Sequence, residues 1–395
     1  MGRIAVVAVC DFRKLPNGGE VFLLNNLFSA MQSDKNEYYL IGMTFNDQDR
    51  IGKWNLISIG GRTYNFFPVA KVTKDKEKTK IPFRLRMVYG LIKYKSTIMS
   101  MGFDSVYIHS AELGIPFWHD YNRINLIYHV HGDPSQTLRY SRFPLFRFEV
   151  FTKLYLALIN KTIKKSKKII WAANRPKNEY KKLVSEEMVD IIEKKSVTVH
   201  SSFDRKLTVD YDSIPRLTNR RHLVTVSRLA KIKHVDFIIE CLKELIVKGY
   251  NVDLIVCGDG EELEPLKKLA KNLGISDRVL FFGLCNRKQI ATCLNCSDVF
   301  LFASESEAMS LVVLESLYMG TPVVSTDVGD ISDVVVADKT GYIVEGYKLH
   351  DYVQMIEKVM RKNKAEYLNE CRSMVQRYTP EFMAVSIDEE MNNVK

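Results

Sequence analysis

Two carboxylates and two cations in the second half of this sequence have the types and spacing to bind a diphosphate. Glu307 and Glu315 are eight residues apart. This spacing puts Glu307 in a polar loop and Glu315 about two turns into a helix, if that helix begins near Met309. Arg228 and Lys233 follow a β-branched segment. A guanidinium fork and an ammonium group just before a helix can neutralise two phosphates, so we predict a metal-independent site.

Backbone groups supply two further anion sites. The amides of Met309, Ser310 and Leu311 would be unpaired at the start of the predicted helix, where phosphate or sugar oxygens are favoured. Gly18 and Gly19 precede another predicted helix and form either an anion cradle or an ordinary strand-to-helix turn. The dinucleotide fingerprint G-x-G-x-x-G is missing from this loop, which argues against a nicotinamide or flavin enzyme.

A pair of histidines ends a predicted strand in the first half. His129 and His131 lie in the string Tyr128–Asp133, at the carboxyl end of the strand, where open α/β sheets bind ligands. A site histidine and a structural histidine are equally compatible with this pattern. We expect His129 to point to the opposite face from His131.

Short β-branched runs alternate with amphipathic stretches along the whole chain, which predicts an α/β protein with mostly parallel sheets. Val235–Ile246 has apolar residues at the three-and-four spacing of a helix with one buried face. The predicted strands of the first half are Ile4–Val9, Tyr38–Met43, Ser105–His109, Asn125–Val130 and Lys168–Ala172, and those of the second half are Leu223–Val226, Val252–Cys257, Val279–Phe282, Asp298–Phe302 and Pro322–Ser325.

The length of 395 residues suits two domains of ordinary size. We predict an N-terminal acceptor-side domain over 1–205, a linker over 206–221 and a C-terminal nucleotide-sugar-binding domain over 222–378. The last segment, 379–395, is predicted to form a helix that starts at Pro380 and crosses back to the first domain.

The ordered motifs of the second half resemble the family 4 retaining glycosyltransferases of the GT-B fold. The E-x7-E motif of that family matches Glu307 and Glu315, and Val226–Lys233 resembles its strand-loop segment. The resemblance implies that Glu315 grips the ribose hydroxyls, that Glu307 faces the donor sugar, and that Arg228 and Lys233 hold the pyrophosphate. It also implies two Rossmann-like domains that face each other across a cleft.

The same resemblance extends to three further positions, while the chain departs from the family pattern elsewhere. It implies that Gly283 and Leu284 lie against the nucleobase and that His131 contacts the donor sugar. The family usually has glycine after its lysine, whereas this chain has His234. The expected catalytic residues are therefore His131, Glu307, Arg228 and Lys233.

The expected function is a retaining glycosyltransferase, of the hexosyltransferase type, for bacterial polysaccharide or glycolipid assembly. The donor would be a nucleotide-diphosphate sugar, with a UDP-sugar preferred, and the acceptor a sugar or lipid-linked hydroxyl; no cofactor is expected. The alternatives are a nucleotide-sugar epimerase or hydrolase on the same fold, and a non-catalytic nucleotide-binding or membrane-docking module.

The composition limits the partners. The net charge is +10 with 46% hydrophobic residues, and the seven cysteines suit reduced thiols in a cytoplasmic protein. Basic residues mix with aromatic residues over Lys71–Lys95 and Arg139–Lys168, which favours either an anionic surface on the inner face of the cell membrane or a solvated helix. No recognition motif accompanies the charge, so we do not expect nucleic-acid binding.

Overall fold

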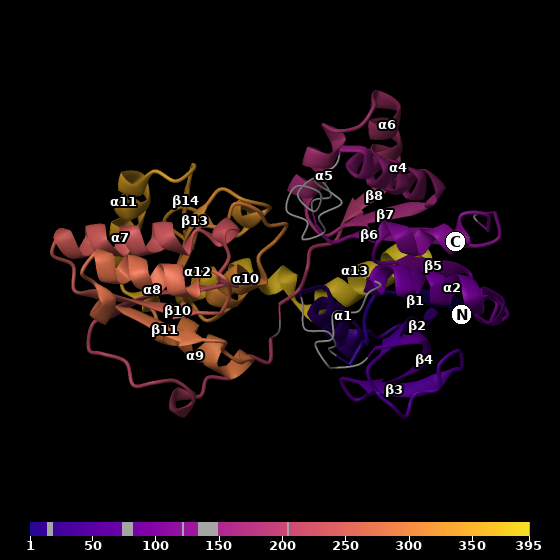
Figure 1. Cartoon of the computed structure of the whole chain (residues 1–395), viewed down its shortest axis with the longest axis horizontal. Helices are drawn as coiled ribbons and strands as arrows, with labels where there is room; N and C mark the ends of the chain where they lie inside the picture. Colours follow the sequence, from indigo (N-terminus) through magenta and orange to yellow (C-terminus); the bar gives the residue numbers. More distant parts are fainter. Residues whose placement is uncertain (14–18, 73–81, 121, 133–148, 204, 395) are drawn as a thin grey trace. The chain divides into compact units, whose positions relative to one another are not determined.

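The computed structural model describes all residues except 14–18, 73–81, 121, 133–148, 204 and 395. The chain forms two compact units (Figure 1). Unit 1 contains Met1–Ser202 together with Pro380–Lys395, and unit 2 contains Phe203–Thr379. Each unit has a largely parallel sheet, as the alternation of strand and helix patterns predicted.

The sheet of unit 1 has the strand order β3-β4-β2-β1-β5-β6-β7-β8. All neighbouring strands are parallel except β3 and β4, which form an antiparallel pair at one edge. The strands are β1 (Gly2–Val7), β2 (Asn36–Thr44), β3 (Asn55–Ile59), β4 (Arg62–Lys71), β5 (Ser105–Ile108), β6 (Asn125–Val130), β7 (Lys168–Trp171) and β8 (Ser196–Thr198).

Two apolar clusters form the core of unit 1. The helices are α1 (Gly19–Ala30), α2 (Phe83–Met99), the 3-10 helix η1 (Ala111–Phe117), α4 (Glu149–Lys165), α5 (Asn174–Lys181), α6 (Glu186–Lys195) and the C-terminal α13 (Pro380–Asn392). Helix α13 packs on α1 and β2 and buries Ile387. The Asp388 carboxylate accepts hydrogen bonds from the Tyr38 hydroxyl at 2.6 Å and the Asn36 amide at 2.9 Å, so the end of the chain is anchored in unit 1.

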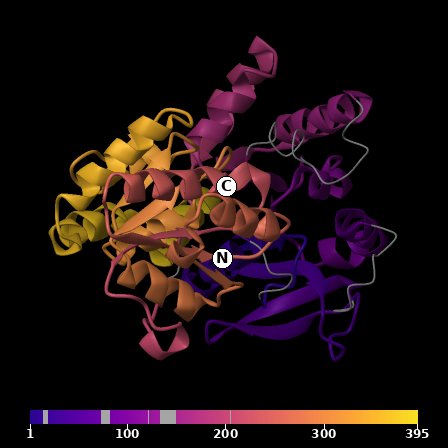
Figure 2. The ribbon, with the colours of Figure 1, turned by 60° about the vertical axis from the view of Figure 1, so that its left-hand side comes forward.

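The sheet of unit 2 is parallel, with the order β11-β10-β9-β12-β13-β14. Its strands are β9 (Arg221–Val226), β10 (Val252–Cys257), β11 (Val279–Gly283), β12 (Val299–Phe302), β13 (Val323–Thr326) and β14 (Gly341–Val344). The helices are α7 (Val235–Val247), α8 (Leu263–Asn272), α9 (Arg287–Cys296), α10 (Leu311–Tyr318), α11 (Leu349–Met360) and α12 (Lys364–Met374), with short 3-10 turns between them. Figures 1 and 2 show these helices around the sheet, which lies in their middle.

The order of the strands creates a switch point in each sheet. In unit 2 the chain moves outward from β9 through β10 to β11, and then returns to pair β12 with the other side of β9. In unit 1 the corresponding pair is β1 and β5. Ligands of open α/β sheets bind outside the carboxyl ends of the strands at such points, so we expect ligand sites at these two positions.

Candidate functional site

The switch point of unit 2 brings together two of the predicted site residues. Lys233 follows β9 in the 3-10 helix η4 (Lys231–Lys233), and Glu307 follows β12. The Lys233 ammonium forms an ion pair with the Glu307 carboxylate and lies 3.3 Å from the Ser304 hydroxyl. Both side chains of the ion pair are about one fifth exposed, so a ligand can reach them. In this structure Glu307 is thus the counter-ion of Lys233, the cation that we expect to hold the phosphates of a nucleotide sugar.

Arg228 lies in the turn directly after β9, and its side chain is exposed. Its neighbours fix the backbone, because Ser227 N donates to Cys257 O at 3.1 Å and Leu229 N donates to Asp259 O at 2.9 Å. A Cβ atom on Gly258 would lie 1.8 Å from the Ser227 carbonyl oxygen. The glycine is therefore required for the close approach of two backbones, and the guanidinium extends from a rigid turn at the same edge as Lys233.

The amides of Met309, Ser310 and Leu311 lie at the start of α10, as the sequence predicted, but the helix starts later than expected. Ser310 has an extended backbone (φ −78°, ψ 114°) and caps the helix, which begins at Leu311 rather than near Met309. Glu315 consequently lies just over one turn into the helix and not two. Met309 and Ser310 are buried, with 6% and 5% of their surfaces exposed.

Glu315 has a partner that the sequence analysis missed. The carboxylate, in a residue only 2% exposed, forms an ion pair with Arg287 (Nη2 to Oε1, 2.7 Å). Arg287 is the first residue of α9, whose start is marked by a capping box between Asn286 and Gln289. That N-x-x-Q signal was readable in the sequence, but the pairing of Arg287 with Glu315 was not. A third cation thus stands at the edge where we expect the nucleotide.

Gly283 and Leu284 lie where β11 ends, at the same carboxyl edge of the sheet. Gly283 has a positive φ of 66° and no neighbouring atoms where a Cβ would stand. Leu284 is 86% exposed, which is unusual for a leucine and leaves an apolar side chain free to cover a flat ligand. Their predicted contact with a nucleobase stays a prediction.

His234 occupies a conformation that explains why a glycine is usual at this position. Its backbone is left-handed, with φ and ψ both 46°. The imidazole lies 3.6 Å from the Glu305 carboxylate and stacks at a slant on Tyr347, with the ring centroids 4.2 Å apart. These contacts offset a backbone strain of about 1–2 kcal/mol and keep the turn between η4 and α7.

The histidines of unit 1 correct one expectation. His129 and His131 do not point to opposite faces: their rings stack, with centroids 4.1 Å apart. Residues two apart on a strand share a face, and the expectation misapplied this rule. His109, which follows β5, joins them, because its Nδ1 lies 2.6 Å from His131 Nε2. Burial lowers the pKa of His131 to about 4, so this imidazole is neutral at pH 7.

One nitrogen from each of His109, His129 and His131 lies within 4.8 Å of the others. Imidazole lone pairs lie in the ring plane, and the planes of His131 and its two neighbours are only 23° and 14° apart. Within these nearly parallel planes, His109 Nδ1 and His131 Nε2 lie only 2.6 Å apart as a hydrogen-bonded pair. As they stand, the three rings form a stacked, hydrogen-bonded group with Tyr107, whose hydroxyl lies 2.5 Å from His129 Nδ1.

The glycine pair of the first loop is only partly described. Gly18 lies outside the described residues, and Gly19 is the first residue of α1. The helix that begins there buries Leu24, Leu27 and Phe28 completely.

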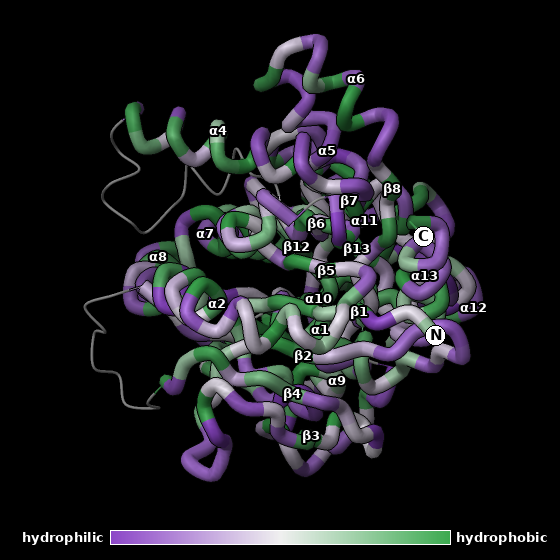
Figure 3. Tube along the Cα trace, turned by 90° about the vertical axis from the view of Figure 1, so that its right-hand side faces the viewer, coloured by the Kyte–Doolittle hydropathy of each residue, from purple (hydrophilic) through white to green (hydrophobic). Residues whose placement is uncertain are grey.

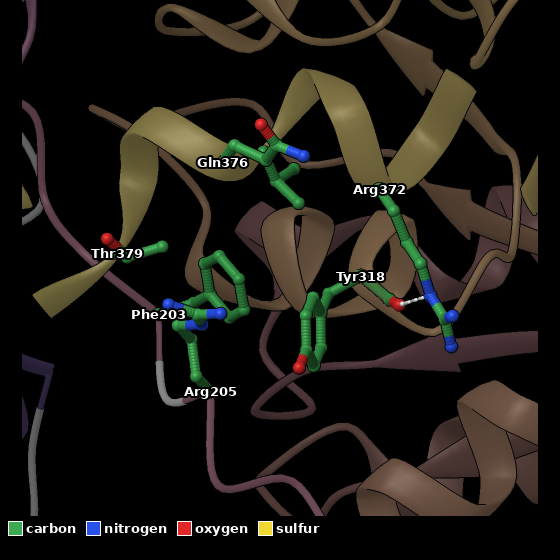
Figure 4. A pocket seen from close by; sticks show the side chains of 7 residues that line it. Phe203, Arg205, Tyr318, Arg372, Gln376 and Thr379 are labelled. Atoms are coloured by element: carbon green, nitrogen blue, oxygen red, sulfur yellow. Dashed lines mark hydrogen bonds between the residues drawn. The ribbon is translucent and has the colours of Figure 1, made fainter. Parts of the chain in front are cut away.

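A pocket of about 320 Å³ in unit 2 contains none of the predicted residues (Figure 4). Its lining comprises Phe203, Arg205, Tyr318, Arg372, Val375, Gln376 and Thr379. Arg372 Nε donates to the carbonyl oxygen of Tyr318 at 3.2 Å. Tyr318 is the last residue of α10, so the pocket lies at the opposite end of this helix from Ser310 and the expected phosphate position.

Comparison with known proteins matches part of the chain to a family. Residues 211–377 match the model of the family described as glycosyl transferases group 1. N-acetyl-alpha-D-glucosaminyl L-malate synthase from Bacillus anthracis is 36% identical over 123 residues, which are 31% of this chain and 32% of that protein. The alignment thus spans about a third of this curated relative, and the matched family region lies within unit 2.

Solved structures resemble the whole chain in fold. Sucrose-phosphate synthase from Thermosynechococcus elongatus has a TM-score of 0.77 at 15% identity, covering 100% of this chain and 99% of that one. The Anabaena protein HepE, solved in complex with UDP-glucose, has a TM-score of 0.68 at 16% identity, with 99% of both chains covered. At these identities the likeness shows the fold, which is the GT-B fold with two α/β domains that the sequence predicted.

Proposed function

We propose that this protein is a retaining glycosyltransferase that moves a sugar from a nucleotide-diphosphate sugar to a hydroxyl acceptor. The proposal rests mainly on one observation: Lys233, Glu307 and the Arg287–Glu315 pair all occupy the carboxyl edge of the unit 2 sheet, within the region that matches the glycosyltransferase family. The likeness in fold to a protein that was solved with UDP-glucose supports a UDP-sugar as donor. Assembly of bacterial polysaccharide or glycolipid is the setting that we propose.

The chemistry assigned to this edge is stabilisation of a leaving diphosphate. Lys233 and Arg228 neutralise the charge that develops as the sugar-phosphate bond breaks, and the amides at the start of α10 add hydrogen bonds. Glu315 accepts hydrogen bonds from the ribose hydroxyls, while Glu307 gives up Lys233 and turns to the donor sugar. The acceptor hydroxyl attacks on the face of the leaving group, and the diphosphate takes its proton. No metal is needed for these steps, and His131 is assigned a contact with the donor sugar.

A thermal-shift panel of nucleotide sugars tests the proposal. A donor that binds only the folded protein raises the melting temperature by mass action, and at 100 times its Kd the gain is about 2.7 kcal/mol. The preferred donor is then incubated with and without acceptors. A sugar product that forms without any acceptor would identify a hydrolase or an epimerase, and binding without turnover would identify a non-catalytic module. If no nucleotide sugar shifts the melting temperature, the proposal is wrong.

The acceptor side has a surface suited to a membrane. On α2, Leu85, Tyr89 and Ile92 are 56–69% exposed and share one helical face. On α4, Val150 and Leu154 are each 62% exposed. Figure 3 shows hydrophobic and hydrophilic residues interleaved along α4. No helix in the described ranges is long and apolar enough to span a bilayer.

We propose that this surface rests on anionic lipid, because exposed lysines flank the apolar residues. Lys93 lies beside Ile92, and Lys153 lies beside Leu154. Such a mixture is typical of interfacial helices on acidic membranes. The parts of the basic stretches within 73–81 and 133–148 lie outside the described residues.

Replacing both Leu85 and Ile92 with serine is expected to weaken binding to vesicles by about tenfold, because two exposed apolar side chains no longer insert. Sedimentation with phosphatidylcholine vesicles, with and without phosphatidylglycerol, measures this effect. Leu183→Ser is the matched control, since Leu183 is also about half exposed but lies beyond α5. Binding that does not depend on phosphatidylglycerol, or that is equal in all variants, would exclude this surface as a membrane site.

A further inference from the structure

The switch point of unit 1 holds a polar cluster that the donor chemistry does not use. Strand β1 leads to Cys10 and, after the loop, to Glu20 in the first turn of α1. Strand β5 leads to Glu112 in η1. Since β1 and β5 are neighbours at the switch point, both carboxylates belong to the edge where a ligand of this sheet is expected.

Four elements contribute side chains to this cluster. Arg84, from the first turn of α2, places Nη1 3.0 Å from Glu112 Oε1 and 3.4 Å from the hydroxyl of Tyr155 on α4. Glu20, from α1, interacts electrostatically with both Arg84 and Glu112. A sheet edge, three helices and a 3-10 helix thus position one guanidinium, one phenol and two carboxyl groups together.

The buried carboxylate of Glu112 lacks hydrogen-bond partners among the described residues. The residue is only 7% exposed, yet neither carboxylate oxygen accepts a hydrogen bond from the residues that the structure describes. Arg84 supplies an ion-pair contact to Oε1 alone. A buried carboxylate without hydrogen bonds costs free energy. The oxygens of Glu112 are therefore positioned to accept hydrogen bonds from a ligand.

The charge of the cluster selects the chemical class of that ligand. Arg84 balances one carboxylate, which leaves the cluster neutral or at −1 according to the protonation of Glu20. Burial raises the pKa of Glu20 to about 7, against the opposing effect of the Arg84 guanidinium and with a further rise from Glu112. Such a cluster accepts hydrogen bonds from hydroxyl groups and disfavours a second anion, because like charges repel.

We propose that Glu20, Arg84 and Glu112 bind the acceptor, and that this acceptor is a neutral polyhydroxyl group, such as a sugar, rather than a phosphate or carboxylate. The inference rests on the proposed function and adds the substrate class of its second site. The hydroxyls of the acceptor donate to the Glu112 and Glu20 carboxylates, and Arg84 holds Glu112 in place.

The test measures glycosyl transfer from the donor selected by thermal shift to four probes: glucose, octyl glucoside, glucose 6-phosphate and L-malate. Transfer to the neutral probes is expected to exceed transfer to the two acids. Glu112→Gln should raise the KM for the acceptor substrate about tenfold, because the charged carboxylate no longer accepts hydrogen bonds from its hydroxyl groups. The KM for the donor nucleotide sugar should stay within about twofold. Glu186→Gln on α6, an exposed carboxylate in the same unit, should behave as wild type.

The pH dependence of kcat/KM tests the role of Glu20, because a purely structural role of this residue would not affect it. Its carboxylate ionises as the pH rises through about 7, so kcat/KM for the acceptor should rise over the same range in the wild type. Glu20→Gln should abolish this rise. Among the residues that the structure describes, the other titratable groups that interact with Glu20 are Cys10, Glu112 and Tyr155, and Arg84 stays charged throughout.

Preference for an acidic probe, an unchanged acceptor KM in Glu112→Gln, or a pH dependence retained in Glu20→Gln would overturn the inference. None of these results affects the donor site, which nucleotide binding tests separately. A protein that binds no nucleotide sugar would instead refute the proposed function.

Discussion

Replacing Lys233 with alanine is expected to lower kcat by about 100- to 1,000-fold, the range seen when one preorganised group that stabilises developing charge is removed. The Lys233 ammonium lies 3.3 Å from Ser304 and pairs with Glu307, so it is held at the edge where the diphosphate is expected to leave. The variant also leaves the Glu307 carboxylate without its counter-ion beside the phosphates. Steady-state kinetics with the preferred nucleotide sugar measures the loss.

Lys231 offers a matched control within the same turn. Lys231 and Lys233 belong to one 3-10 helix, but Lys231 is exposed and does not pair with Glu307. Lys231→Ala should therefore retain kcat within about twofold, since surface substitutions away from a site have small effects. Equal losses in both variants would mean that general positive charge, and not the position of Lys233, matters. A Lys233→Ala protein with normal kcat would remove Lys233 from the mechanism.

Replacing Asp253 with alanine is expected to lower the free energy of unfolding by about 3 kcal/mol, the cost of breaking a buried charge network. Asp253 on β10 is fully buried, and its carboxylate accepts hydrogen bonds from Thr218 at 2.6 Å, from Arg278 at 2.8 Å and from Arg220 at 3.2 Å. The alanine variant leaves two guanidinium groups partly buried without their common partner. Urea unfolding followed by circular dichroism measures the change.

The same network predicts a pH dependence. Burial alone would raise the pKa of Asp253, but Thr218, Arg278 and Arg220 together lower it below the usual value. A carboxyl group with a lowered pKa stabilises the fold above its unfolded pKa of about 3.9, and this contribution is lost as the pH falls through the folded pKa. The difference in stability between wild type and Asp253→Ala should therefore shrink below about pH 3.9.

Asp277 provides the control for Asp253. It is exposed in the neighbouring 3-10 turn Ser276–Arg278, and Asp277→Ala should change stability by less than about 0.5 kcal/mol. Asp253 is the second residue of β10 and lies at the amino end of the strand, opposite the edge of the donor residues. Folded Asp253→Ala should therefore bind nucleotide normally. An unchanged urea midpoint would show that the network contributes nothing to stability.

The strands that the sequence predicted are all present, because each is a short run that is rich in apolar residues. Val252–Cys257 is one such run, and all six residues are buried. Four strands were not predicted from the sequence: β3 and β4, which form an antiparallel edge, and the short strands β8 and β14. Strand β4 contains Pro68 and polar residues at its start, so its local pattern is that of a loop. Pairing with β2 overrides that local preference.

In the candidate site, too, some residues were predicted from the sequence and others were found only in the structure. The E-x7-E spacing and the basic turn singled out Glu307, Glu315 and Lys233 as candidates, since local order places each of them after a strand. Arg287 was not predicted, because its partner Glu315 is 28 positions away in the sequence and no local pattern indicates an ion pair over such a distance. Glu112 was not predicted, because its burial without hydrogen bonds depends on how the folded chain packs around it.

By itself, the sequence determined the alternation of strands and helices, and hence two α/β domains with candidate site residues at the ends of strands. These features follow from short-range periodicity, which each segment carries within a few residues. Tertiary structure alone decided which strand ends become neighbours at β9 and β12 and at β1 and β5. It thereby decided which charges meet, because strand order depends on the free energy of burying whole faces together rather than on any local pattern.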